Sequence, residues 1–406
     1  MNLKQSVDYL RSPQAIREQC GRLLTLAGQD RLAHFALRPE RLEETAAYVL
    51  AVMREEYPDL QIPYHSRWRH FGQESRQQLD QALAGCTPAD AAKSRLELAI
   101  VSVLLDAGAG MSWRYRDVAS GHESSKSEGL AMASFAMFMA GAFSGDTQEP
   151  LRADPVGLQR LDAAALRRGF QVTADNPLVG LEGRLALLRR LGEAILASPR
   201  HFGTKSPRLG NIYDYLATEA AAGQLPARTI LAAVLEALGP IWPGRVTLDG
   251  VNLGDVWRHP ALPLGDLGQG LVPFHKLSQW LTYSLVEPLE WSGLVVTGLD
   301  ELTGLAEYRN GGLFIDMGVL VPKSPAALTE MHAPDAALIV EWRALTLTLL
   351  DETARRIRAE LGLTSAAFPL AKVLEGGTWK AGRRLAAKLR EGGGPPIRLA
   401  SDGTVF

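Results

Sequence analysis

The segment "AKSRLELAIVSVLLDAG" (residues 92–108) is apolar nearly all round from Leu96 to Leu105. An amphipathic surface helix would show a single apolar stripe, so this pattern predicts a helix that is buried on every side. Asp106 and the breaker run that follows it end the segment. The chain has 406 residues and 46% hydrophobic content, which is enough for a core that encloses such a helix.

Other helical patterns spread evenly over the chain. Apolar residues recur at spacings of three and four in "RLEETAAYVLAVMREEY" (41–57), in "LEGRLALLRRLGEAILAS" (181–198) and in the long segment 335–361. We expect two further apolar segments to be helical. The first is "SKSEGLAMASFAMFMAGAF" (125–143), with Ser127 as its expected cap. The second is "VPFHKLSQWLTYSLVEPLEW" (272–291), which we expect to be helical until Pro288. Residues 212–238 read as two helices that are broken near Gly223 and Pro226.

Strand patterns are short and lie in the C-terminal half. The first is "GRVTLDGVNLGDVW" (244–257), and "SGLVVTGL" (292–299) and the end of the chain supply two more. No internal repeat or linker interrupts the series of helices. We therefore predict a mainly α protein, a single compact multi-helix domain over residues 1–406 with small β additions in the C-terminal half, and a C-terminal subregion from about residue 370.

Charge and cysteine content narrow the class of protein. The 45 acidic and 43 basic residues give a net charge of −2, which argues against a nucleic-acid binder. No apolar run reaches membrane-spanning length, and the N-terminus lacks the apolar core of a signal peptide. We expect a cytoplasmic protein with no membrane or nucleic-acid partner, in which Cys20 and Cys86 are free thiols.

Two candidate clusters lie in the N-terminal half. "PYHSRWRHF" (63–71) combines histidines and arginines with Trp68; it lacks the HExxH spacing of a zinc protease, and its arginines suit an anion or a partner surface. In "LLDAGAGMSWRYRD" (104–117), Asp106 ends a very apolar helix, and desolvation would raise its pKa and suit it to proton transfer. Trp113 and Tyr115 could stack on a ligand ring, but ordinary helix termination with core aromatics explains the same pattern.

Three more clusters lie in the C-terminal half. Lys276 sits in the apolar segment "FHKLSQWLTYSL" (274–285), where it either reaches water or meets a carboxylate. In "LTGLAEYRNGGLF" (302–314), Glu307 beside Arg309 suggests a structural ion pair, and the glycine pair 311–312 allows close approach of a ligand or of another helix. "EGGTWKAGRRLAAKLR" (375–390) resembles a basic helix opened by two glycines, a weak anion-site pattern that is not a Walker A loop.

Together these stretches, with "NLGDVWRHPAL" and the closing "SDGTVF", resemble the uracil catabolism protein family from about residue 5 to the end of the chain. The resemblance implies a pathway, shared with a GTP-cyclohydrolase-II-like enzyme, in which the pyrimidine ring is opened while it is attached to ribose phosphate. A ribosylurea-type intermediate then has to lose urea. That enzyme is the protein partner that the resemblance implies.

The order of segments is also similar to the queuosine salvage family, which hydrolyses the N-glycosidic bond of a nucleotide. Its "KRAQ"-like helix and "DYRVPQ"-like stretch correspond here to "KLSQ", which begins at Lys276, and "EYRNGG", which begins at Glu307, thirty-one positions on. Glu stands where that family has Asp, and "NGG" where it has "VPQ". These departures imply a pocket of different size and a different leaving group.

These resemblances imply a hydrolase that cleaves an N-ribosidic C–N bond of a ring-opened uridine nucleotide. Glu307 would stabilise the oxocarbenium-like state as nucleophile or base, Lys276 would pair with it, and Asp106 would protonate the leaving nitrogen. Trp113 and Tyr115 would line the sugar or urea end, and either Arg309 or the Arg67–Arg69 pair would hold a phosphate. The other expected substrate contacts are Tyr308, Asn310, His275, Gln279, Glu128 and Trp68.

Two alternatives stay open at this point. The protein could bind a nucleotide without catalysis, as a partner of the cyclohydrolase-like enzyme. It could also be an amidohydrolase that acts on the same intermediate, a chemistry that usually uses a metal, for which the sequence shows no compact ligand set. We expect no metal and no cofactor.

Overall fold

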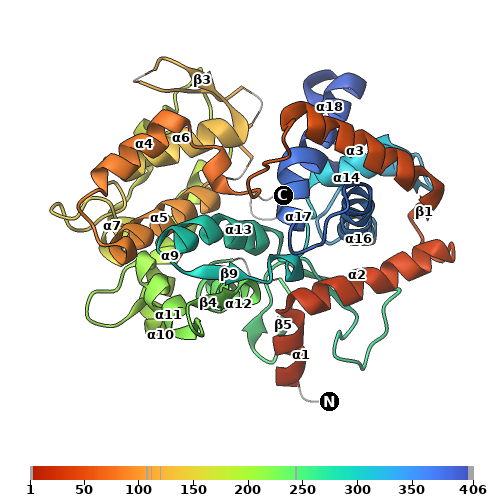
Figure 1. The fold of residues 1–406 in the computed structure, drawn as a ribbon, viewed down its shortest axis with the longest axis horizontal. Helices are drawn as coiled ribbons and strands as arrows, with labels where there is room; N and C mark the ends of the chain where they lie inside the picture. The colour runs from red at the N-terminus through yellow and green to blue at the C-terminus, as the bar shows by residue number, and fades with distance from the viewer. Residues whose placement is uncertain (1–2, 107, 111, 119, 243–244, 401–406) are drawn as a thin grey trace. The chain divides into compact units, whose positions relative to one another are not determined.

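The computed structural model describes residues 3–106, 108–110, 112–118, 120–242 and 245–400. The chain divides into two compact units: unit one comprises residues 1–65, 244–279 and 298–406, and unit two comprises residues 66–243 and 280–297. Both units are built mainly from helices, which confirms the predicted fold class (Figure 1). The single-domain assignment stays a prediction, and the residues from 370 onward belong to unit one.

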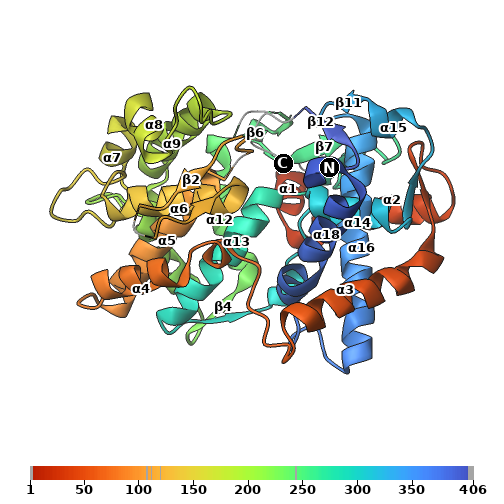
Figure 2. The same cartoon turned by 90° about the horizontal axis from the view of Figure 1, so that it is seen from above.

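Unit one is organised around its long helix α16, which packs against α2, α3 and α14 (Figures 1 and 2). Its helices are α1 (Leu3–Leu10), α2 (Pro13–Gly28), α3 (Leu42–Glu56), α14 (Tyr308–Asp316), α15 (Ala326–Thr329), α16 (Ala337–Leu361), α17 (Leu370–Val373) and α18 (Trp379–Leu389), with the π-helix η6 (Leu374–Thr378) and the 3₁₀ turns η1 (Pro39–Arg41), η5 (Leu299–Glu301) and η7 (Glu391–Gly393).

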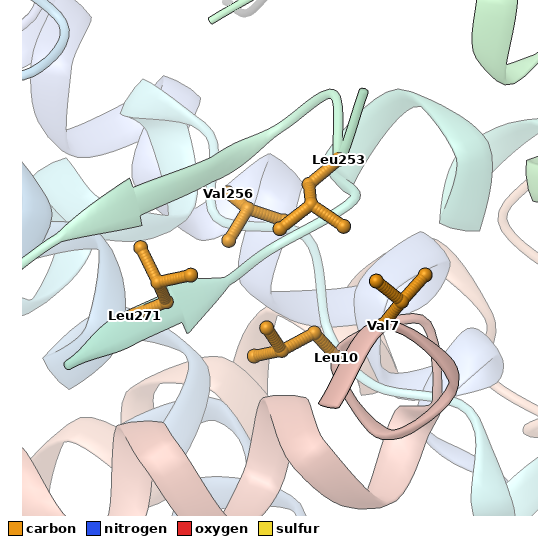
Figure 3. Close-up of a cluster of buried hydrophobic side chains, with 5 residues drawn as sticks. All are labelled: Val7, Leu10, Leu253, Val256 and Leu271. Carbon is orange, nitrogen blue, oxygen red and sulfur yellow. The ribbon is translucent and has the colours of Figure 1, made fainter. Parts of the chain in front are cut away.

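The strands of unit one form two-stranded ribbons. The pairs are β1 (Phe35–Leu37) with β10 (Leu320–Pro322), β5 (Thr247–Leu248) with β6 (Val251–Asn252), β7 (Val256–Arg258) with β8 (Leu271–Pro273), all antiparallel, and β11 (Met331–His332) with β12 (Arg398–Leu399), which is parallel. Figure 3 shows how Val7 and Leu10 of α1 meet the apolar side chains of Leu253, Val256 and Leu271. This cluster fixes the β7–β8 ribbon against the N-terminal helix.

Unit two has α5 (Pro88–Leu104) at its centre, and every residue from Leu96 to Leu105 is buried, as the apolar pattern predicts. Its other helices are α4 (Gln73–Ala82), α6 (Lys126–Met139), α7 (Pro155–Arg160), α8 (Ala163–Gly169), α9 (Leu181–Ala197), α10 (Pro199–Phe202), α11 (Ile212–Glu219) and α12 (Ala227–Leu238), with the 3₁₀ turns η2 (Arg67–Arg69), η3 (Leu209–Asn211) and η4 (Gly239–Ile241). Its strands pair β2 (Tyr115–Arg116) with β3 (Glu123–Ser124), and β4 (Gln224–Pro226) with β9 (Val295–Thr297).

The strands predicted near residues 244–257, at 292–299 and at the end of the chain are present as β5 to β7, β9 and β12. The strands β1, β2 and β3 lie in the N-terminal half and were not predicted. Each is only two or three residues long. Such short strands carry too few residues for an alternation of polar and apolar side chains to show.

Helix α13 (Lys276–Trp291) corrects the expectation that Pro288 ends it. A proline in a helix cannot hydrogen-bond to the carbonyl four residues before it, which is that of Ser284. The Trp68 indole Nε1–H donates to this carbonyl at 2.9 Å and takes the place of the lost bond. The helix also begins later than predicted, because Val272 and Pro273 belong to β8.

Two further details of the helix ends differ from expectation. Ser125, rather than Ser127, is the N-cap position of α6. Gly376 and Gly377 do not open a helix, because they lie inside η6, which continues without a break from α17 into α18. There is therefore no free helix N-terminus at these glycines, and the expectation that they open a helix is wrong.

Gly382 allows α18 to pack directly on α14. A Cβ at this position would lie 2.2 Å from the Arg309 carbonyl oxygen, whereas a Cβ at Gly21 of α2 would meet nothing within 4 Å. We expect Gly382→Ala to lower the free energy of unfolding by about 1–3 kcal/mol, since backbone has to move. Gly21→Ala should raise it by up to about 1 kcal/mol through helix propensity. Urea unfolding of both variants checks this, and equal shifts in the same direction would contradict the close-packing explanation.

Candidate active site

The candidate residues fall into two groups, one in each unit. Unit one contains His275, Lys276, Gln279, Glu307, Tyr308, Arg309 and Asn310, and unit two contains Arg67, Trp68, Arg69, Asp106, Trp113, Tyr115 and Glu128.

Glu307 is the N-cap residue of α14. Its Oε2 accepts a hydrogen bond from the backbone N–H of Arg309 at 2.8 Å, and its Oε1 accepts one from that of Asn310 at 2.6 Å. A helix N-terminus favours a negatively charged side chain, because the unpaired N–H groups carry partial positive charge. The carboxylate is therefore held in one orientation at the start of the helix.

Arg309 does not form the ion pair with Glu307 that adjacency in sequence suggested. Its guanidinium carbon lies 5.2 Å from the centre of the Tyr308 ring and 5.0 Å from that of Trp379. Among the described residues the guanidinium has no carboxylate partner. Glu307 caps α14 and Arg309 contacts aromatic rings, so the two charged side chains have different contacts.

Gly311, the first glycine of the pair 311–312, accommodates another helix. A Cβ at Gly311 would lie 2.8 Å from the Trp342 ring of α16, and the indole Nε1–H donates to the Gly311 carbonyl at 3.1 Å. The sequence allowed close approach of either a ligand or another helix, and at Gly311 the structure supports close packing of a helix.

A buried ion pair joins the segments that contain Lys276 and Glu307. Arg343 Nη1 and Nη2 donate to the two carboxylate oxygens of Asp255 at 2.7 and 2.8 Å. Asp255 Oδ2 also accepts from the Lys276 backbone N–H at 3.0 Å, and Arg343 Nε donates to the carbonyl of Ala306 at 3.3 Å. The pair thus connects the first residue of α13 to the residue that precedes Glu307.

The electrostatics of this pair follow from its surroundings. The Arg343 side chain is 1% exposed and that of Asp255 15%. Burial by itself would raise the pKa of Asp255, but Arg343 and the donors of Trp257 and Lys276 outweigh it and lower the pKa below its ordinary value of 3.8. Sequence reasoning missed both residues, although a charged side chain in the apolar runs "NLGDVW" and "VEWRAL" was an available signal.

His275 and Lys276 stand at the start of α13. His275 has a positive φ of 47°, and its Nε2 lies 2.8 Å from the carbonyl oxygen of Leu10. Burial lowers the pKa of this imidazole. A buried ring in contact with backbone supports the turn into α13, and the pairing of Lys276 with Glu307 stays a prediction.

Gln279 and Asn310 each bury an unpaired polar atom. Gln279 is 0% exposed and Asn310 1% exposed. Within the part of the chain that the structure describes, neither amide atom of Gln279 has a hydrogen-bond partner, and the Asn310 side-chain oxygen has none either. Because a buried unpaired polar group is costly, each such group calls for an explanation, and contact with a bound ligand is one.

The π-helix η6 places Glu375 beside the aromatic residues of unit one. Glu375 Oε2 lies 2.8 Å from His65 Nδ1, and the Tyr57 hydroxyl donates to Oε1 at 3.5 Å. The His65 ring centre is 6.1 Å from that of Trp379, which also contacts Arg309. π-Helical turns are rare and are frequent at functional sites, so this segment belongs with the candidate site.

In unit two, Asp106 and Arg67 form a buried ion pair. Arg67 Nη1 donates to Asp106 Oδ2 at 2.8 Å, Nε donates to Ser102 Oγ at 2.7 Å, and the Ser127 hydroxyl donates to Asp106 Oδ1 at 3.0 Å. Burial lowers the pKa of the Arg67 guanidinium, and the nearby charges of Asp106 and Glu128 oppose that shift. The Asp106 side chain is 6% exposed, and it has a cationic partner in Arg67.

The other candidates of unit two are mostly packed into its core. Arg69 is paired with Glu287. Trp68 is 1% exposed and contacts Phe71 and Trp291. Trp113 is 0% exposed and its indole N–H donates to the Phe170 carbonyl at 2.9 Å, and Tyr115 is 3% exposed. For these aromatics the core explanation fits the structure better than ligand stacking, because their faces are covered by protein.

Within the described residues no helix has the length and apolar character of a membrane-spanning segment. The same part of the chain contains no group of three or more His, Cys, Asp or Glu side chains placed to hold a metal ion. Cys20 and Cys86 are both free, as expected. Residues 401–406, which end the family-like closing segment, lie outside the described residues.

Comparison with known proteins places the chain in a family. The model of a family described as "Protein of unknown function (DUF1688)" matches residues 9–406. The chain is 38% identical over 416 residues to "Protein urg3" of Schizosaccharomyces pombe, covering 99% of each chain. It is 34% identical over 443 residues to "Uracil catabolism protein 4" of Lachancea kluyveri, covering 100% of each. The chain therefore belongs to the DUF1688 family and to the family of this Lachancea kluyveri uracil catabolism protein.

Proposed function

We propose that this chain acts in uracil catabolism as a hydrolase that cleaves the ribosyl C–N bond of a ring-opened, ribosylurea-type uridine derivative and releases urea. The name of the Lachancea kluyveri relative supports the pathway. The observation that carries the reaction class is the Asp255–Arg343 pair, which joins the start of α13 to the Glu307 segment. Its hydrogen bonds link the first residue of the KLSQ motif to the residue that precedes the EYRNGG motif.

In the proposed reaction, the bond between the anomeric carbon and the urea nitrogen breaks, and positive charge develops on the sugar. The Glu307 carboxylate, held by two backbone N–H groups, would stabilise this oxocarbenium-like state or attack it. Water supplies the oxygen that ends on the anomeric carbon, and the leaving nitrogen takes up a proton. Capping uses one acceptor site on each carboxylate oxygen, and a second lone pair on each remains for the substrate.

Lys276 has a secondary role in the proposal. Lys276 would pair with Glu307 and keep it aimed at the sugar. Asp106 belongs to the other unit, and its expected role as proton donor stays a prediction. Gln279 and Asn310, with unpaired buried amide atoms, would bind the ureido group, which offers both donors and an acceptor.

The decisive experiment incubates the purified chain, without any partner enzyme, with N-ribosylurea 5-phosphate and with N-ribosylurea. Release of urea is the expected result. A non-catalytic binding protein would release none until an enzyme partner is added. An amidohydrolase would instead release ammonia, and either of these outcomes would overturn the proposal.

A further inference from the structure

We propose that Arg309, held between Tyr308 and Trp379, binds the phosphate monoester of the substrate, and that the enzyme therefore acts on a ribose 5-phosphate derivative in preference to the free riboside. We call these three residues the Arg309 clamp. The inference rests on the proposed function and adds to it the substrate class and the residue that recognises it.

Arg309 differs from the other two candidate phosphate contacts in having no carboxylate partner. Arg67 is paired with Asp106 at 2.8 Å, and Arg69 is paired with Glu287. Arg309 is only 9% exposed, yet in the described part of the chain its guanidinium meets aromatic rings and no acid. A buried cation needs a counter-charge, and an anionic ligand would supply it.

The clamp also orients the guanidinium. Tyr308 precedes Arg309 in α14, and Trp379 comes from the first turn of α18, whose Gly382 lies against the Arg309 carbonyl. Rings at 5.2 and 5.0 Å hold the planar group by cation–π contact and restrict its motion. A guanidinium held in this way presents its N–H donors as a fork that matches two oxygens of a phosphate.

The position of the clamp suits a ribosyl phosphate. The backbone N–H of Arg309 is 2.8 Å from Glu307 Oε2, so the anion-binding side chain starts in the same helical turn as the proposed catalytic carboxylate. The sugar would then lie at Glu307 while its phosphate lies at Arg309. One helix terminus would thus position both ends of the substrate.

The test is calorimetric binding of ribose 5-phosphate and of ribose to the full chain. We expect ribose 5-phosphate to bind at least about tenfold more tightly than ribose, and Arg309→Met to weaken it by about tenfold to a hundredfold. Arg309→Lys keeps a cation but loses the fork, so it should weaken binding less, without a change in melting temperature. The matched control is Arg384→Met, because Arg384 lies on α18 but is paired with Glu55 and Glu56, and this variant should bind as wild type does.

The proposal is overturned if wild type does not prefer ribose 5-phosphate, or if both Arg309 variants bind it as wild type does. Failure of the proposed reaction has a different signature. If the protein binds ribose 5-phosphate through Arg309 but releases no urea, the phosphate site is supported and the proposed hydrolase activity is contradicted. If the protein releases urea equally fast from phosphorylated and unphosphorylated ribosylurea, the hydrolase activity is supported and the phosphate site is contradicted.

Discussion

Replacing Glu307 by Gln or Ser should lower the turnover number for urea release by about 10²–10⁴-fold, while the protein stays folded. The negative charge that would stabilise the oxocarbenium-like state is removed in both variants. The capping function is not removed, because a serine hydroxyl or an amide oxygen can still accept from a backbone N–H of Arg309 or Asn310. The measurement is steady-state urea release per mole of folded protein.

The competing explanation for Glu307 is that it only caps α14. A capping residue changes stability by about 0.5–2 kcal/mol when its cap is lost, and it does not change turnover of the folded fraction. Asp162→Ser is the matched control, since Asp162 caps α8 by accepting from the Ala165 N–H at 2.7 Å. If Glu307→Ser behaves like this control, with turnover within about twofold of wild type, Glu307 is not catalytic.

Breaking the Asp255–Arg343 pair should have the largest effect on stability. We expect Asp255→Asn to lower the free energy of unfolding by about 3–5 kcal/mol, because it leaves the buried Arg343 cation without its counter-charge. The double variant Asp255→Asn/Arg343→Met should lose less than the sum of the single variants, since it also removes that cation. Arg384→Met, which breaks a more exposed pair, should cost no more than about 1 kcal/mol. Equal effects of Asp255→Asn and Arg384→Met in urea unfolding would contradict the importance assigned to the buried pair.

The same pair predicts a pH dependence. The pKa of Asp255 is lowered in the folded protein from its ordinary value of 3.8, so its contribution to stability is complete above that pH and is lost as the pH falls through the folded pKa. The difference in unfolding free energy between wild type and Asp255→Asn should therefore be constant above about pH 5 and shrink below about pH 4. A difference that stays constant down to about pH 3 would show that Asp255 is not stabilised as an anion.

The helical skeleton could be predicted from the sequence because it follows from local patterns. The all-apolar run from Leu96 to Leu105 predicted its own burial, and leucines at spacings of three and four predicted α9. The end of α13 could not be predicted in this way. The helix continues through Pro288 because Trp68, far away in the sequence, donates to the Ser284 carbonyl.

The candidate site was predictable only in part, for a similar reason. The Glu307 and Lys276 segments were found by resemblance, but the Asp255–Arg343 pair that joins them consists of residues 88 positions apart. Closeness in sequence also gave a wrong prediction, because Glu307 and Arg309 suggest an ion pair. In the structure the Glu307 carboxylate accepts from backbone N–H groups at the start of α14, and the Arg309 guanidinium contacts aromatic rings. Partners of charged side chains depend on the fold, and periodicity carries no information about them.

The most direct test of the proposed hydrolase follows the ureido carbon itself. N-Ribosylurea 5-phosphate labelled with carbon-13 at that carbon is incubated with the purified chain and observed by NMR. We expect the label to appear in urea, at a rate that Glu307→Gln lowers by about 10²–10⁴-fold. Label that appears in bicarbonate, or that stays in the substrate, would contradict cleavage of the ribosyl C–N bond by this protein.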